Sequence, residues 1–124
     1  MHSKKEIKIM RHEVKKISRM VDELTTLFLK EDTNELDFKI VITKEKCIIK
    51  IVDYHTNFDD AYIEQLSKRL NSQRQREIEE YYWQLAGETD EDDEITLICA
   101  MVDSAVVEKK GGNLMLELTR LYTS

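Results

Sequence analysis

The sequence contains no proline, and only three of its 124 residues are glycine. It also contains no low-complexity linker and no internal repeat, so nothing in it marks a domain boundary. A chain of this length can form one two-layer hydrophobic core but is too short for two. We therefore expect residues 1–124 to fold as a single domain.

Long apolar runs are absent as well, since none approaches the roughly 20 residues needed to cross a bilayer. The basic start, Met1–Lys5, is not followed by an uninterrupted apolar segment, so we expect no secretory signal. The two cysteines, Cys47 and Cys99, lie far apart within apolar segments and predict buried thiols rather than a disulfide. These features favour a cytoplasmic protein without a membrane partner.

The charge is negative overall and unevenly distributed. A formal net charge of -6 argues against general nucleic-acid binding. Residues 1–30 are basic on balance, whereas residues 88–94 are almost continuously acidic. A solvated surface is the simplest explanation of both runs, and docking of a partner by the acidic segment is the alternative. The histidines and cysteines show no metal-ligand spacing, so we expect no metal site.

The N-terminal region, residues 4–30, has the apolar spacing of one long helix. Its apolar residues follow in steps of four and three and predict one buried stripe: Met10, Val14, Ile17, Val21, Leu24 and Phe28. The same spacing fits a short coiled-coil seam. We favour packing against a sheet, with the turns before Met10 free to pair with another copy.

Strands are predicted in two places where apolar residues alternate with polar ones. They pair as two hairpins: 36–43 with 47–52, and 105–108 with 114–118. In the first hairpin, Phe38, Ile40 and Ile42 are expected to point inward. Gly111 and Gly112 mark the turn of the second hairpin, because adjacent glycines suit tight hairpin turns.

Helical spacing fills the regions between the hairpins: 59–70, 73–86 and 95–103. Asp59 and Asp60 suit a helix N-terminus, and Gly87 suits a helix end. Asn71–Ser72 is a weak point that separates two helices. The resulting order predicts an α+β protein, a two-layer sandwich in which a mostly antiparallel sheet of about four strands carries its helices on one face.

The C-terminal third has a helix ending near an aspartate, then a strand, a glycine turn and a last alternating strand: 98–103, 106–108, 111–112 and 114–118. With the hairpin that ends in Asp53, this order resembles the histidine-kinase-like (GHKL, or Bergerat) ATPase fold, especially the small bacterial anti-sigma-factor kinases. The resemblance spans about residues 10–122 and lacks the family's first strand and helix. It implies that Asp53 stands where the family binds adenine.

Three departures from that family bear on activity. The resemblance requires an asparagine one turn after Glu23, but Leu27 stands there and cannot bind a hard cation. No glycine follows Asp53, and residues 90–94 place carboxylates where a glycine-rich loop should hold phosphates. The resemblance therefore implies a non-catalytic pseudo-ATPase without a cofactor. The alternative is a divergent ATP-binding protein, such as an anti-sigma-type serine kinase or a histidine-kinase-like ATPase.

Two candidate sites remain. Asp53 either contacts an adenine-type base in a residual pocket or accepts hydrogen bonds from the loop at Thr56 and Asn57. Tyr81, Tyr82 and Trp83 follow one another on a predicted helix, so they point in different directions. At least one should be exposed for a partner, since aromatics are enriched at interfaces. We expect a bacterial regulator that binds a protein partner or forms a homodimer.

Overall fold

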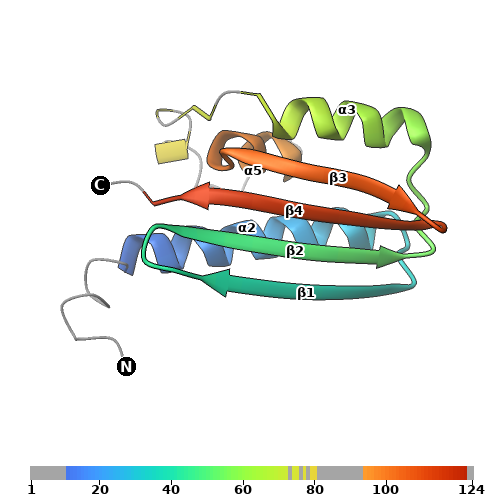
Figure 1. The fold of residues 1–124 in the computed structure, drawn as a ribbon, viewed down its shortest axis with the longest axis horizontal. Coiled ribbons are helices and arrows are strands. Elements are labelled where there is room, and N and C mark those ends of the chain that lie inside the picture. The colour runs from blue at the N-terminus through green and yellow to red at the C-terminus, as the bar shows by residue number, and fades with distance from the viewer. Residues whose placement is uncertain (1–10, 73, 76, 78, 81–93, 123–124) are drawn as a thin grey trace.

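The computed structural model of the chain describes residues 11–72, 74–75, 77, 79–80 and 94–122. Within them the elements follow in the order α2 (Arg11–Lys30), β1 (Glu35–Ile42), β2 (Lys46–Tyr54), α3 (Asp60–Leu70), α5 (Glu94–Met101), β3 (Ser104–Lys110) and β4 (Asn113–Leu121) (Figure 1). The expected α+β class is confirmed, and the elements that the structure describes follow in the expected order. None of the described helices is long and apolar enough to cross a membrane.

The four strands form one antiparallel sheet in the order β1-β2-β4-β3. The two hairpins therefore meet through β2 and β4, where Ile49 lies opposite Leu118 and Lys50 lies opposite Glu117. The described helices pack on one side of the sheet, as predicted (Figure 1). We call the opposite side the open face, because no described element covers it.

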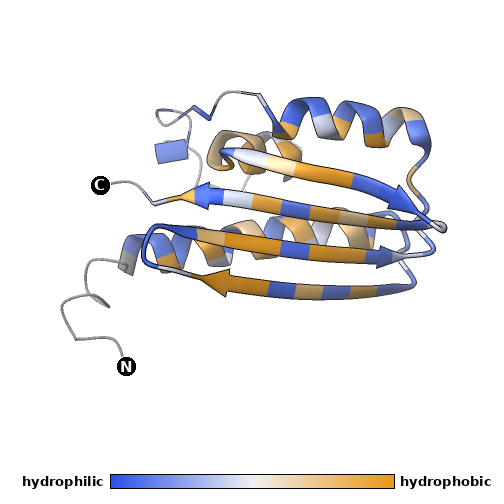
Figure 2. Cartoon of the chain, viewed as in Figure 1, coloured by the Kyte–Doolittle hydropathy of each residue, from blue (hydrophilic) through white to orange (hydrophobic). Residues whose placement is uncertain are grey.

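The core lies between the helices and the sheet. Met20, Leu24 and Phe28 of α2 are fully buried there. Both central strands are largely apolar, with polar residues between the apolar ones (Figure 2). Their buried residues alternate with more exposed ones and point toward the helices: Cys47, Ile49, Ile51, Asp53, Leu114, Leu116, Leu118 and Arg120. Asp53 and Arg120 are the polar members of this series, and they occupy opposite ends of the sheet.

Local signals in the sequence set the element ends. The Asp59 carboxylate accepts a hydrogen bond of 2.7 Å from the Tyr62 backbone N–H and so caps α3. Asn71 ends the same helix. Gly111 and Gly112 have φ values of 60° and 83°, which a two-residue hairpin turn requires. The predicted cap, helix break and glycine turn are confirmed.

Some expected core residues are exposed. Val14 was expected on the buried stripe of α2 but is 54% exposed. Ile40 and Ile42 point to the helix side of the sheet by register, yet they are 44% and 47% exposed. Their strand is at the sheet edge, and no described element covers that end of it. Residues 4–10 and most of the expected helix 73–86 lie outside the described residues.

Both cysteines are free thiols, as expected. Cys47 is fully buried on β2, whereas Cys99 on α5 is half-buried. Burial raises the pKa of the Cys47 thiol to about 11 because the interior disfavours the thiolate. Cys47 therefore has the character of a small core residue rather than of a nucleophile.

Candidate functional site

Asp53 lies at the end of β2 on the helix side of the sheet and is only 1% exposed. Its carboxylate accepts a hydrogen bond from the Thr33 hydroxyl, which comes from the turn between α2 and β1. The sequence-based alternative named Thr56 and Asn57 as the donors. The structure shows Thr33 instead, because the turn after α2 folds back to the end of β2.

The loop after Asp53 closes this end of the sheet. The Thr56 N–H donates to the Gly112 carbonyl over 3.0 Å, and the Asn57 amide donates to the carbonyls of Glu31 and Asp32 over 2.8 and 3.0 Å. Phe58 is buried nearby, with its ring edge-on to Phe28 at 5.6 Å and stacked on Tyr62 at 4.7 Å. These contacts surround Asp53 with protein.

Positions 23 and 27, which correspond to the Mg²⁺-binding residues of the GHKL family in the resemblance, face the core. Glu23 and Leu27 of α2 are both buried. Among the described residues, no group of three or more histidine, cysteine, aspartate or glutamate side chains has the arrangement to hold a metal ion. The part of the chain that the structure describes therefore shows no cluster of these side chains that could bind a cation.

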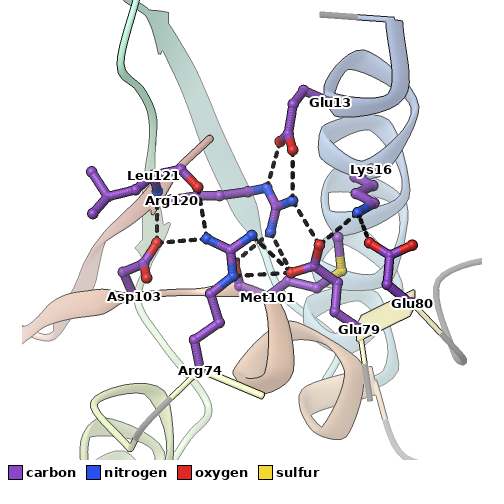
Figure 3. A network of polar contacts seen from close by, with 9 residues as sticks. All are labelled: Glu13, Lys16, Arg74, Glu79, Glu80, Met101, Asp103, Arg120 and Leu121. Atoms are coloured by element: carbon purple, nitrogen blue, oxygen red, sulfur yellow. Dashed lines mark hydrogen bonds and ion pairs between the residues drawn. The ribbon is translucent and has the colours of Figure 1, made fainter. Parts of the chain in front are cut away.

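A cluster of buried charges lies at the other end of the sheet (Figure 3). It joins α2, residues 74, 79 and 80, the end of α5 and the last residues of β4. We call it the ion cluster: the buried side chains of Glu13, Lys16, Arg74, Glu79 and Arg120, together with the half-buried Asp103. Three of these six side chains are cations and three are carboxylates, so their charges balance.

Arg120 is the centre of the ion cluster and is 1% exposed. Its guanidinium donates to both carboxylate oxygens of Glu13 over 2.8 and 3.1 Å, and to both of Glu79 over 2.8 and 2.9 Å. A fifth bond of 2.8 Å reaches the Met101 carbonyl. All five N–H groups of Arg120 are therefore satisfied, which is the condition for burying a guanidinium.

The other cations extend the ion cluster on both sides. The Lys16 ammonium donates to Glu79 over 2.7 Å and to Glu80 at the rim. Arg74 contacts Glu79 and donates to Asp103 over 2.9 Å and to the Leu121 carbonyl over 2.6 Å. Segments distant in the sequence are thus tied together at one point.

The ion pairs of the cluster shift the pKa values of Glu79 and Lys16 so that their charged forms are favoured. Burial alone would raise the pKa of Glu79, but the hydrogen bonds from Arg120 and Lys16 outweigh it and lower that pKa to about 2. Burial opposes the charge of Lys16 as well, yet its bonds to Glu79 and Glu80 raise its pKa. A general acid or base needs a pKa near the working pH, so these groups suit structure better than proton transfer.

The open face presents outward residues from all four strands. Register places them in rows across β1, β2, β4 and β3: Asp37, Val52, Met115 and Glu108; Lys39, Lys50, Glu117 and Val106; Val41, Ile48, Thr119 and Ser104. Val106 is 51% exposed and Met115 is 41% exposed. A hollow of about 560 Å³ lies on this face, lined by residues of all four strands.

The candidate residues from the sequence fall in different places. Asp53 lines neither the hollow on the open face nor a second one beside α2. Tyr81, Tyr82 and Trp83 lie outside the described residues, as does the acidic segment up to residue 93, so their partner-binding role stays a prediction. The ion cluster was missed. Its signal was Arg120, a charged residue at a core-facing position of an alternating apolar strand.

Comparisons with protein-family models, curated proteins and solved structures found no match to this chain.

Proposed function

We propose that this chain is a non-catalytic regulatory domain that binds a protein through the open face of its sheet. The observation that carries the proposal is the pair of large apolar side chains, Val106 and Met115, that the open face exposes around its hollow. Apolar side chains gathered on one face and bordered by charges are typical of interaction sites. Binding there would remove them from water.

The surroundings of Asp53 support a non-catalytic role. Its buried carboxylate already accepts a hydrogen bond from Thr33, and the loop 55–58 closes that end of the sheet. The resemblance to GHKL proteins adds that the domain is a degenerate member of that fold, in a bacterial cytoplasmic circuit of the anti-sigma or partner-switching type. That part of the proposal depends on analogy of fold.

Differential capture from a lysate of the source cells tests the binding function. The wild-type chain should retain a partner that Met115→Lys loses, because a lysine cannot be buried there without a counter-charge. Val14→Lys is the matched control, since Val14 is also an exposed apolar residue but lies on α2. With the purified partner, we expect Met115→Lys to weaken binding at least about tenfold. Equal retention by all three proteins would contradict the proposal.

A thermal-shift titration with ATP, ADP and GTP, with and without Mg²⁺, tests the non-catalytic role. A nucleotide at 100 times its dissociation constant adds about 2.7 kcal/mol of stability, which shifts the melting temperature visibly. We expect no shift at millimolar nucleotide. A saturable shift that Asp53→Asn abolishes would instead support the divergent ATP-binding alternative.

A further inference from the structure

The two central strands of the open face carry opposite charges, whereas the edge strands β1 and β3 each carry both signs. Lys39 and Lys50 lie directly opposite each other on β1 and β2, whereas Glu117 and Glu108 lie on β4 and β3. Like charges opposite each other in a sheet repel. Glu117 faces Lys50 from the other side but lies two strands away from Lys39. The lysine pair would therefore gain from a carboxylate placed over it, and Glu117 of a second copy can supply one.

We propose that the open face binds the open face of a second copy, forming a two-fold dimer in which β2 of each copy lies over β4 of the other. This dimer rests on the proposed function and identifies the protein partner as a second copy of the chain. Two sheets that pack face to face keep their strands roughly aligned, about 10 Å apart. A two-fold axis parallel to the strands, between β2 and β4, produces this arrangement.

That axis places opposite charges over each other on the central strands and leaves a like-charge pair at the rim. Lys50 of each copy lies over Glu117 of the other, since both occupy the same row. Val52 lies over Met115 at the centre, where the apolar residues gather. Asp37 lies over Glu108, and this like-charge pair falls on edge strands at the rim, where water and salt screen it.

One row further along, the edge residues are also complementary. Glu35 on β1 pairs with Tyr54 of β2, and Lys110 on β3 pairs with Asn113 of β4, at the same end of the sheet. The same axis places Glu35 of one copy over Lys110 of the other. An axis across the strands would instead lay β2 of one copy over β2 of the other, so that Lys50 would not face Glu117. Charge complementarity therefore selects the axis along the strands.

The size of the face sets the expected affinity. With strands about 4.8 Å apart and about 3.3 Å per residue, four strands of about seven residues cover roughly 450 Å² of flat area. Stable complexes bury about 800 Å² of accessible surface per partner, so this interface lies at the small end. We expect a dimer that dissociates in the micromolar range.

Sedimentation equilibrium from about 1 μM to about 500 μM, a range that brackets micromolar dissociation constants, tests the dimer. The wild-type chain should shift from monomer to dimer over this range. Lys50→Glu and Glu117→Lys should each weaken association at least about tenfold, because each places like charges across the interface. Lys15→Glu on the exposed surface of α2 is the control and should associate like the wild type. Circular dichroism checks that each variant is folded.

Mixing the two variants gives the decisive result. In a mixed dimer the reversed charge at position 50 faces the reversed charge at position 117, and the remaining Lys50 faces the remaining Glu117. An equimolar mixture should therefore recover the wild-type association. A monomeric wild type at every concentration, unchanged association in either variant, or a mixture that stays monomeric would overturn the dimer. Capture of a different protein that depends on Met115 would still support the proposed function.

Discussion

The two faces of the sheet carry charged side chains under opposite conditions. Arg120, on the helix side, is buried and has a partner for each of its N–H groups. Lys50, on the open face, is exposed and lies opposite Glu117. Removing one partner of a buried ion pair costs several kcal/mol, whereas an exposed pair contributes about 1 kcal/mol or less. Charges on the helix side therefore hold the fold, whereas those on the open face contribute little to it.

The largest expected effect comes from removing the centre of the ion cluster. Arg120→Met leaves the carboxylates of Glu13 and Glu79 buried without their main cation, which should lower the free energy of unfolding by about 3–5 kcal/mol. Lys109→Met is the matched control, because it breaks an exposed 3.0 Å ion pair with Asp60 and should cost less than about 1 kcal/mol. Urea denaturation measures both. Similar losses of unfolding free energy in the two variants would contradict the difference between buried and exposed ion pairs.

Adjacent residues on opposite faces sharpen the comparison. Leu116 is buried on the helix side of β4, whereas its neighbour Met115 is on the open face. Leu116→Ala should lower the free energy of unfolding by about 2–5 kcal/mol through the cavity it leaves. Met115→Ala should change it by less than about 0.5 kcal/mol. If urea denaturation shows equal losses, the open face is covered in the folded monomer.

Acid should remove part of the stabilisation by the ion cluster. The pKa of Glu79 is lowered from 4.5 to about 2, so its stabilisation is complete above the unfolded pKa and is lost as the pH falls toward 2. A shift of this size corresponds to about 3 kcal/mol. In denaturation at several pH values, the stability gap between wild type and Glu79→Gln should close by about that amount between pH 6 and pH 2. A gap independent of pH would rule out the lowered pKa.

The smallest expected loss on the helix side concerns Asp53. Thr33→Val removes the hydroxyl that donates to this buried carboxylate and should cost about 1–3 kcal/mol. Thr26→Val is the control, because the Thr26 hydroxyl bonds the Asp22 carbonyl of its own helix at the surface. Thermal or urea denaturation of both variants measures the difference. A cost no greater for Thr33→Val than for the control would show that Asp53 needs no partner.

The elements of the fold were predictable because their signals are local. The glycine pair 111–112 predicted a turn that needs positive φ, and Asp59 predicted a helix start that its side chain caps. The stripe of α2 was predicted with one error, since Val14 has the right spacing but is exposed at its position. Helical periodicity identifies a face, but the neighbouring elements decide how much of it is covered.

The ion cluster could not be assembled from the sequence. Arg120 alone breaks the apolar alternation of β4, and this could have flagged it, but Glu13 and Glu79 look like ordinary exposed helix residues. Asp53 was singled out from the sequence, yet its donor, Thr33, lies twenty positions away. Partners that meet through the fold leave no trace in local spacing.

The sequence by itself determined the helices, the hairpins and their turns, because periodicity, capping and backbone preference act over a few neighbouring residues. Only the tertiary structure decided which charges are buried and which are exposed. It joined the hairpins through β2 and β4, placed the helices on one side, and left the other side open. Burial and charge pairing depend on segments far apart in the chain, so they follow from how the elements pack and not from any one of them.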